Sequence, residues 1–246
     1  MAWVSSKVVR RHEWAPGLIT LGLDSVVEAH VAGQFVNLAI ERDGAKIKRS
    51  YSLASAPGQP SEFYVTEVQG GVVTPSLLSL SVGDPLWVDD RALGFFTLDH
   101  VPAAPHVWLL ATGTGLGPFI AMLRSPTIWE RFSRIVLIHG VRHTAQLGYM
   151  DELSLLARRS PEQLSYVPLV TREVPPPFGL AGRLPALVRS GELERRAGVL
   201  FAPGQSQVLL CGNPEMISET QRALGERGLE KHRAKKPGHV TLESYW

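Results

Sequence analysis

Apolar and polar residues form short alternating runs over the first hundred residues of the chain. Turn signals such as Pro16-Gly17, Asp43-Gly44 and Gly70-Gly71 separate these runs. Several strands at this spacing predict an antiparallel β-barrel. The strand-like runs are residues 2–9, 18–23, 34–39, 49–54, 63–68 and 85–88. A helical stretch at 74–80 fits a short cap over one end of such a barrel.

The pattern changes after Asp99. Residues 100–105 contain two prolines and two alanines and are typical of a linker. Beyond them, strand-like and helical runs alternate, which predicts a doubly wound parallel sheet with right-handed crossovers. The strand-like runs are 107–111, 134–141, 164–171 and 208–211, and the helical runs are 118–124, 149–158, 184–190 and 214–226. We therefore expect two domains, a β-barrel over 1–100 and an α/β domain over 101–246.

Length and composition narrow the classes of function. With 246 residues, 44% of them hydrophobic, the chain can bury two ordinary cores. No apolar run reaches the roughly 20 residues needed to cross a bilayer, and the first 14 residues lack the apolar stretch of a signal peptide. We expect a cytoplasmic protein with no membrane partner. The net charge of +2 is too balanced to predict nucleic-acid binding.

The chain has one cysteine, Cys211. One cysteine permits neither an intrachain disulfide nor a four-thiolate iron–sulfur cluster. The histidines, His139 among them, show no metal-ligand spacing, so we expect no metal. Any redox chemistry must come from a bound organic cofactor or a partner.

A glycine-rich loop is the strongest single signal. The apolar run that ends at Thr112 leads directly into Gly113-Thr114-Gly115-Leu116-Gly117-Pro118, and a helical pattern follows. Glycines let the backbone turn tightly and approach a pyrophosphate, while a helix N-terminus offers unpaired N–H groups and partial positive charge. Pro118 suits the first helical turn. The loop predicts a dinucleotide site, although a plain strand–helix turn has the same pattern.

Arginines stand where a dinucleotide-binding fold often carries a ribose-binding acid. The second strand of the α/β domain leads into Arg142 and the third into Arg172, and Arg183 follows in a Gly-Arg turn. Arginines at these places can hold a 2′-phosphate through charge-assisted hydrogen bonds. They favour NADPH over NADH, although any one of them could be an ordinary surface arginine.

The barrel half carries two further candidate motifs. Arg49-Ser50-Tyr51-Ser52 offers a cation for a phosphate, an aromatic ring for stacking and hydroxyls for hydrogen bonding. Downstream, Gly70-Gly71-Val72-Val73-Thr74 precedes the short helix and could cradle a pyrophosphate by its backbone N–H groups. Each motif is unspecific alone.

Together and in this order, the motifs resemble the ferredoxin/flavodoxin–NADP⁺ reductase family over essentially the whole chain. The stretches that carry the resemblance are Gly33-Gln34-Phe35, Arg49–Ser52, Gly70–Thr74, Gly94-Phe95-Phe96, Gly113–Pro118, Leu209–Met216 and the terminal Glu243-Ser244-Tyr245-Trp246. The ending resembles the bacterial branch. The resemblance implies an FAD-containing oxidoreductase that takes hydride from NADPH and reduces a one-electron carrier, ferredoxin or flavodoxin.

The resemblance also implies residue roles. Arg49 would contact the FAD phosphates, Tyr51 and Ser52 would flank the isoalloxazine, and the Gly70–Thr74 loop would bind the pyrophosphate. Arg142, Arg172 and Arg183 would hold the 2′-phosphate of NADPH. The Cys-Gly pair at Cys211 would lie beside the nicotinamide, so Cys211 is a neighbour of the site and not a nucleophile.

The end of the chain offers three further candidates. Tyr245 or Trp246 would cover the flavin face where nicotinamide enters, in a tail that returns to the flavin; a tail packed into a crevice is the plainer alternative. Glu243 could relay a proton to the flavin, or it could be a solvated carboxylate. Tyr51, Ser52, Cys211, Glu243 and Tyr245 are therefore the predicted catalytic residues, expected to align two rings rather than to react.

Basic residues cluster at two places, and such patches steer acidic partners. One cluster holds Lys46, Lys48 and Arg49, and the other holds Lys231, His232, Arg233, Lys235 and Lys236. Both could equally be solvated loops or helix ends. We expect a monomer that docks an acidic redox carrier. A flavin reductase or the reductase component of an oxygenase is the alternative enzyme, and a nucleotide-binding regulator is the non-enzymatic alternative.

Overall fold

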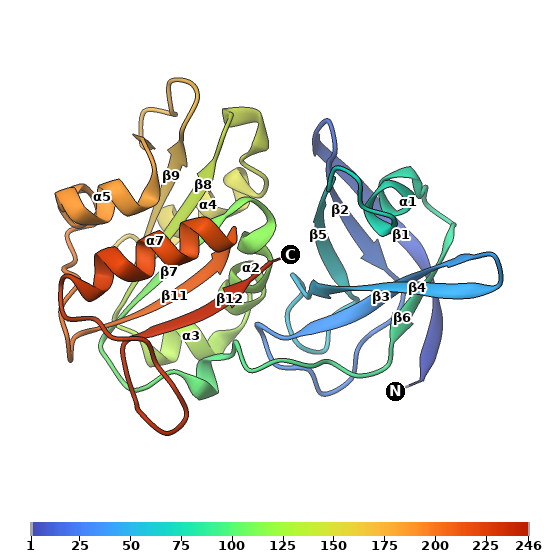
Figure 1. Ribbon diagram of the computed structural model, residues 1–246, viewed down its shortest axis with the longest axis horizontal. Coiled ribbons are helices and arrows are strands. Elements are labelled where there is room, and N and C mark those ends of the chain that lie inside the picture. The colour runs from blue at the N-terminus through green and yellow to red at the C-terminus, as the bar shows by residue number, and fades with distance from the viewer. Residues whose placement is uncertain (1, 246) are drawn as a thin grey trace. The chain divides into compact units, whose positions relative to one another are not determined.

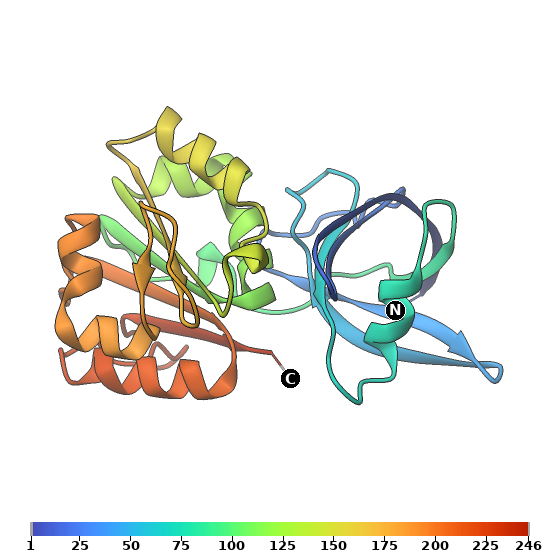
Figure 2. The same cartoon turned by 90° about the horizontal axis from the view of Figure 1, so that it is seen from above.

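The computed structural model describes residues 2–245 and divides into two compact units, shown in Figures 1 and 2. The first unit holds residues 2–98 together with Gly117–Pro126. The second holds Asp99–Leu116 and residues 127–245. The stretch Gly117–Pro126 thus lies in the first unit, although its helix was expected in the second domain. The assignment of FAD to the first unit and NADPH to the second stays a prediction.

The first unit is a six-stranded antiparallel sheet that curls into a barrel (Figure 1). Its strands follow the order β4-β3-β6-β1-β2-β5. A bridge between Leu53 and Phe63, and a hydrogen bond from Ala54 N to Glu62 O (2.8 Å), join the two ends of this order. The strands are β1 (Trp3–Ala15), β2 (Leu18–Leu23), β3 (Phe35–Arg42), β4 (Ala45–Ser52), β5 (Glu62–Thr66) and β6 (Pro85–Asp89).

Strand β1 makes closure possible because it pairs with two neighbours in turn. Its first half pairs with β6, from Trp3 to Lys7, and its second half pairs with β2, from Val8 to Ala15. Register shifts between Val8 and Arg10, and between Glu13 and Ala15, mark bulges in the second pairing. Bulges bend a strand and increase its twist, as closing a barrel requires.

Helix α1 (Val73–Ser79) covers one end of the barrel. Its apolar residues Val73 and Leu77 are fully buried and belong to the same core as the inward residues of β2, β3, β5 and β6. Burying a large aliphatic side chain contributes roughly 1.5–3 kcal/mol, so this contact anchors the loop that precedes the helix.

The second unit is a six-stranded parallel sheet in the order β10-β9-β8-β7-β11-β12. From β7 the chain builds outward to β8, β9 and β10, and then returns to the other side of β7 with β11 and β12. The strands are β7 (His106–Thr112), β8 (Arg134–Val141), β9 (Leu164–Val170), β10 (Leu180–Ala181), β11 (Ser206–Gly212) and β12 (Val240–Ser244). The topological switch point therefore lies between β7 and β11, and such points bind ligands at the carboxyl ends of the strands.

Helices cover both faces of this sheet. Figure 2 shows the yellow α4 on one face and the orange and red α5 and α7 on the other. The helices are α3 (Pro126–Arg131), α4 (Met150–Arg159), α5 (Leu184–Ser190), α6 (Glu192–Ala197) and α7 (Pro214–Gly225). The longest, α7, has 12 residues, and no helix within residues 2–245 is long and apolar enough to cross a membrane.

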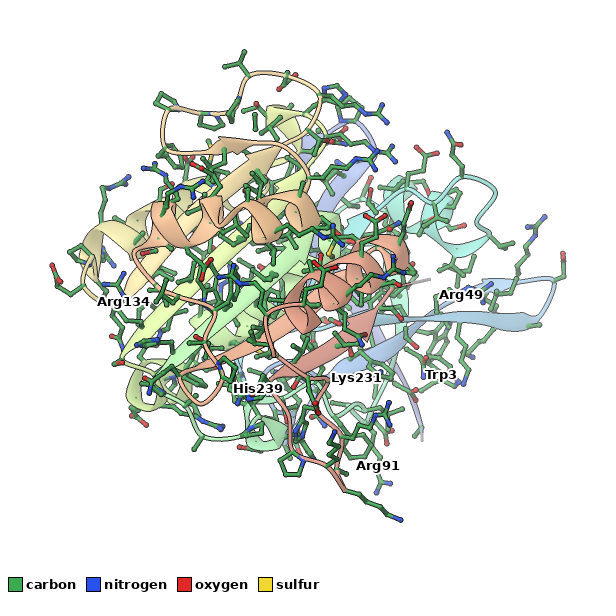
Figure 3. The ribbon with its side chains drawn as sticks, turned by 60° about the vertical axis from the view of Figure 1, so that its left-hand side comes forward. Trp3, Arg49, Arg91, Arg134, Lys231 and His239 are labelled. Atoms are coloured by element: carbon green, nitrogen blue, oxygen red, sulfur yellow. The ribbon has the colours of Figure 1, made fainter. Side chains whose placement is uncertain are left out.

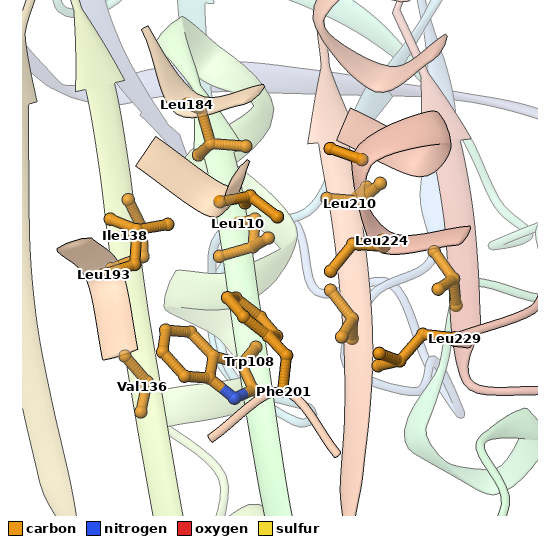
Figure 4. Packing of buried hydrophobic residues seen from close by; sticks show 14 of the residues in the cluster. Trp108, Leu110, Val136, Ile138, Leu184, Leu193, Phe201, Leu210, Leu224 and Leu229 are labelled. Carbon is orange, nitrogen blue, oxygen red and sulfur yellow. The ribbon is translucent and has the colours of Figure 1, made fainter. Parts of the chain in front are cut away.

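Alternate residues of the parallel strands point to the α5–α7 side, as Figure 4 shows. Trp108 and Leu110 of β7 and Leu210 of β11 pack there against Leu224 of α7. The ring of Trp108 stacks on Phe201 with centroids 3.9 Å apart. This continuous core fixes the strands, and with them the loops that leave their carboxyl ends.

The predicted fold class is confirmed, an antiparallel β-barrel followed by a doubly wound parallel sheet. The runs 18–23, 134–141 and 184–190 match β2, β8 and α5 residue for residue. Four elements were missed: α3, α6, β10 and β12. The most consequential is β12, because residues 240–244 were expected in a tail and instead form an edge strand paired with β11.

Helix α2 (Gly117–Leu123) is held in the first unit by a buried ion network. Arg124 Nη1 donates to Glu62 Oε1 (2.7 Å) and to the carbonyl of Ala54 (3.1 Å). Arg10 Nη1 binds the other oxygen of Glu62 (3.1 Å). The Glu62 and Arg124 side chains are 10% and 24% exposed, whereas Arg10 is 56% exposed.

We predict that Arg124→Ala lowers the free energy of unfolding by about 2 kcal/mol, because it leaves a mostly buried carboxylate short of its main donor. Arg10→Ala should cost less than about 1 kcal/mol, since its side chain is largely solvated. Urea denaturation of both variants measures the difference. Equal losses would show that the Arg124 contact is no stronger than a surface ion pair.

Candidate functional site

The glycine-rich loop folds as a tight turn at the switch point. After β7 ends at Thr112, Gly113–Leu116 form one 3₁₀ turn, and α2 begins at Gly117 with Pro118 as its second residue. A Cβ placed on Gly115 would lie 2.4 Å from the carbonyl oxygen of Cys211. Only glycine permits this approach, so the predicted loop is built against the end of β11.

A second close contact joins the end of β11 to the end of β7. Gly212 has φ +137°, and a Cβ there would lie 2.3 Å from Oγ1 of Thr112. The same hydroxyl accepts a hydrogen bond from Asn213 N (3.1 Å). The Asn213 side chain then caps α7, accepting from Glu215 N and Met216 N. The ends of β7 and β11 are thereby locked together.

His139 lies beneath the glycine-rich loop. It is fully buried on β8, and its Nε2 lies 3.1 Å from the carbonyl oxygen of Gly113. Burial lowers the pKa of His139 to about 4, although the hydrogen bond to Gly113 opposes the shift. The neutral ring therefore donates from Nε2 and holds the first glycine. This role was not predicted, because no local pattern relates His139 to Gly113, 26 residues away in sequence.

Three predicted catalytic residues meet in the second unit. Cys211 and Glu243 are directly paired across β11 and β12, with Cys211 Sγ 3.9 Å from Glu243 Oε2. Tyr245 N donates to the carbonyl of Gly212 (3.0 Å). Burial and the neighbouring Glu243 raise the pKa of the Cys211 thiol, while a hydrogen bond with Tyr245 opposes the rise. Trp246 lies outside the described residues.

The predicted 2′-phosphate arginines stand at adjacent strand ends. Arg142 follows β8, Arg172 lies two residues beyond β9, and Arg183 precedes α5. Arg172 N donates to the carbonyl of Arg142 (3.0 Å), so these two are neighbours. All three side chains are exposed, and within residues 2–245 none forms an ion pair.

A carboxylate that was not predicted, Glu173, joins the loops that carry Arg142 and Arg172. Glu173 follows Arg172 directly and reaches the loop after β8, where Oε1 accepts from Thr144 N (2.5 Å) and Oε2 lies 3.2 Å from His143 Nδ1. Its hydrogen bonds with Thr144 and His143 lower the pKa of Glu173 to about 2. In the sequence, only its position next to Arg172 relates Glu173 to the predicted 2′-phosphate site.

In the barrel, the Arg49–Ser52 motif occupies the end of β4. Strand alternation places Arg49 and Tyr51 on one face and Ser50 and Ser52 on the other. Arg49 is exposed (Figure 3), whereas Tyr51 packs against the barrel core. Burial raises the pKa of Tyr51 to about 12, so its phenol stays protonated. Ser50 Oγ donates to Asn37 Oδ1 (3.0 Å).

The Gly70–Thr74 motif forms the turn into α1. Gly70 has φ +73°, and a Cβ on Gly71 would lie 2.9 Å from the carbonyl oxygen of Val68. Thr74 Oγ1 accepts from Val68 N (3.2 Å), which fixes the turn. Val72 is exposed, Val73 begins the helix, and no side chain caps the first turn. Its N–H groups are thus left for another acceptor.

These observations fit both predicted cofactors. A glycine cradle that a Cβ would fill, an uncapped helix start and an exposed arginine suit the phosphates of FAD. The loop at Gly113–Gly117 and three unpaired arginines suit the phosphates of NADPH. Gly117 also lies near the Arg49–Ser52 motif, since its Cβ would be 4.0 Å from the carbonyl oxygen of Ser52. No cluster of three His, Cys, Asp or Glu side chains that could hold a metal occurs within residues 2–245.

Several known proteins are similar in sequence to this chain. Residues 109–222 match the family model of the oxidoreductase NAD-binding domain. The flavodoxin/ferredoxin–NADP reductase of Escherichia coli K12 is 40% identical over 99% of both chains. The ferredoxin–NADP reductase of Pseudomonas aeruginosa is 36% identical over 86% of this chain and 84% of its own.

A solved structure is similar over the same length. It is a ferredoxin NADP⁺ reductase from Neisseria gonorrhoeae with bound FAD and NADP, and it superposes with a TM-score of 0.94 at 29% identity. The match covers 99% of each chain. The similarity therefore extends over both units.

We predict that stability falls between about pH 6.5 and pH 4 because of His139. Its pKa is near 6.5 when unfolded and about 4 when folded, so in this range the unfolded chain binds a proton that the folded chain does not. The loss should reach about 3 kcal/mol. Urea denaturation at several pH values should show a shallower decline in His139→Gln, whose amide can still donate to Gly113. Parallel curves for variant and wild type would refute the assignment.

Proposed function

Because this chain belongs to the flavodoxin/ferredoxin–NADP reductase family, we propose that it is an FAD-dependent oxidoreductase that takes electrons from NADPH and reduces ferredoxin or flavodoxin. The observation that carries the proposal is the set of three exposed, unpaired arginines at adjacent strand ends, Arg142, Arg172 and Arg183. Such a set selects a dianionic 2′-phosphate, which NADPH has and NADH lacks.

The barrel would hold FAD. Arg49 and the N–H groups of the Gly70–Thr74 turn would bind its phosphates. Tyr51 and Ser52 would lie beside its ring, with Tyr51 donating as a neutral phenol because its pKa is about 12. When bound, FAD supplies the step from two-electron to one-electron transfer, which no side chain can provide.

The second unit would hold NADPH. Gly113, Thr114, Gly115, Gly117 and Pro118 form the turn that receives the pyrophosphate. Cys211, Glu243 and Tyr245 would line the nicotinamide end. Their common task is alignment, since the Cys211 thiol is fully buried and its raised pKa keeps it from acting as a nucleophile. We also propose that Trp246 contacts a cofactor.

The two alternatives differ in their expected partners. A flavin reductase would reduce free flavin and would need no protein carrier. A nucleotide-binding regulator would bind NADPH without a flavin. Nothing in the two sites favours either. The cytoplasmic location and the monomeric state stay predictions.

An anaerobic absorbance titration of the purified protein tests the proposal. We expect a flavin spectrum that NADPH bleaches on the order of 10-fold or more faster than NADH, because NADH lacks the charge that the arginines bind. Folded protein that shows no flavin spectrum with excess FAD would refute the reductase and leave a nucleotide-binding protein. Equal bleaching by both coenzymes would refute the arginine assignment alone.

A basic loop before β12 offers the proposed docking surface for the acidic carrier. Lys231, Arg233, Lys235 and Lys236 are exposed on it, and only Lys236 is ion-paired, with Glu230 at 2.5 Å. Lys231 and His239 lie on its two arms (Figure 3), and His239 Nδ1 accepts from Glu230 N (3.2 Å). The loop is a turn closed by a bridge between Arg233 and Lys236.

We predict that Lys231→Glu/Lys235→Glu lowers kcat/KM for ferredoxin or flavodoxin about 10-fold at low salt, because electrostatic steering raises association rates by 10-fold or more. Reduction of ferricyanide, which needs no protein docking, should be unchanged. The matched control is Arg158→Glu/Arg159→Glu on α4, which removes the same charge on the β9 side of the sheet. Equal losses in both variants would mean that net charge, not this loop, steers the carrier.

A further inference from the structure

We propose that Glu173 is a positioning residue for the 2′-phosphate subsite, binding the loop after β8 to the loop after β9 so that Arg142 and Arg172 face one anion. The inference rests on the proposed function, since it assigns the structural basis of NADPH selection. It concerns a residue that need not touch the coenzyme.

The carboxylate joins two segments that are far apart in sequence. Glu173 Oε1 accepts from Thr144 N (2.5 Å), and Oε2 lies 3.2 Å from His143 Nδ1. The Thr144 hydroxyl also donates to this carboxylate. Three donors from one short turn therefore converge on a single side chain of the next loop.

The arginines are fixed by the same two segments. Thr171 N donates to the carbonyl of Val141 and Arg172 N to that of Arg142, so the β8–β9 pairing continues past the strand ends. Gln146 Oε1 accepts from Arg142 N (3.2 Å) and His143 N (3.1 Å), which folds the turn back on Arg142. Glu173 adds a side-chain contact to this backbone pairing, because it binds His143 and Thr144.

The negative charge of Glu173 is satisfied by its contacts with His143 and Thr144, and we call this set of three residues the clamp. Hydrogen bonds from Thr144 and the contact with His143 hold its pKa near 2, so it is ionised at every working pH. It does not pair with Arg142, Arg172 or Arg183, and no other carboxylate within residues 2–245 does. The clamp thus orders the two loops while leaving three cations for an anionic ligand.

Binding of coenzyme fragments by titration calorimetry tests the role. The probes are 2′-AMP, which carries the selected phosphate, and 5′-AMP, which does not. Glu173→Ala should weaken 2′-AMP binding about 10-fold, equivalent to about 1.4 kcal/mol, and leave 5′-AMP binding unchanged. Glu173→Gln should stay within about 3-fold of wild type, because its amide oxygen still accepts from Thr144 N.

A matched control is Glu226→Ala, which removes an exposed carboxylate paired with Arg189 at the end of α7. It should bind both probes as wild type does. In turnover, Glu173→Ala should raise the KM for NADPH and leave kcat unchanged, a division that general loss of folding would not produce.

Three results would overturn the inference. Wild-type binding of 2′-AMP by Glu173→Ala would mean that the carboxylate does not position the arginines, and tighter binding would mean that it only repels the phosphate. Equal weakening of both probes would mean a general structural role. Failure of the proposed function is distinguishable, because wild-type protein would then show no flavin spectrum with excess FAD, or, if NADPH selection itself is wrong, no preference for 2′-AMP over 5′-AMP.

Discussion

The candidate site depends on the close approach of β7 and β11 at the switch point. Gly115 touches the carbonyl of Cys211, and Gly212 touches Thr112, at distances that no residue with a Cβ could reach. Because of this packing, the glycine-rich loop lies directly against the end of β11, where Cys211 is located. Because β12 pairs with β11 in register, it also fixes Glu243 opposite Cys211. One steric constraint thereby places both the phosphate-binding turn and the proposed nicotinamide contacts.

Helix α2 follows the glycine-rich loop directly in the chain and belongs to the barrel unit. The chain leaves the glycine-rich loop at Leu116 and continues without a break into a helix that packs with the β-barrel. Arg124, just past the end of α2, binds Glu62 and the carbonyl of Ala54. Ala54 lies two residues beyond the Arg49–Ser52 motif. The mostly buried carboxylate of Glu62 accepts from Arg124 and from Arg10, so it joins the end of α2 to β1 and β5 of the barrel.

The sequence was informative where a local rule determines the structure. Glycine spacing predicted the loop at Gly113–Gly117, and turn residues separated the barrel strands, because both depend on neighbouring residues alone. Strand β12 was missed because residues 240–244 are short and mixed in polarity, and they become a strand only by pairing with β11. Glu173 was missed for the same reason. Its partners, His143 and Thr144, are about thirty residues away in sequence, and no motif announces a contact of that kind.

Three buried titratable side chains among or beside the proposed site residues are neutral, whereas the arginines proposed for phosphate binding are exposed. Burial raises the pKa of Cys211 and Tyr51 and lowers that of His139, so all three are uncharged near neutral pH. The arginines proposed for phosphate binding are exposed and fully charged. Hydride transfer between two rings needs alignment and little proton transfer, and a fixed charge beside either ring would shift its electron affinity. The exposed arginines thus stand in the loops proposed to bind phosphates, and among the residues proposed to line the nicotinamide end Glu243 is the carboxylate that lies beside Cys211.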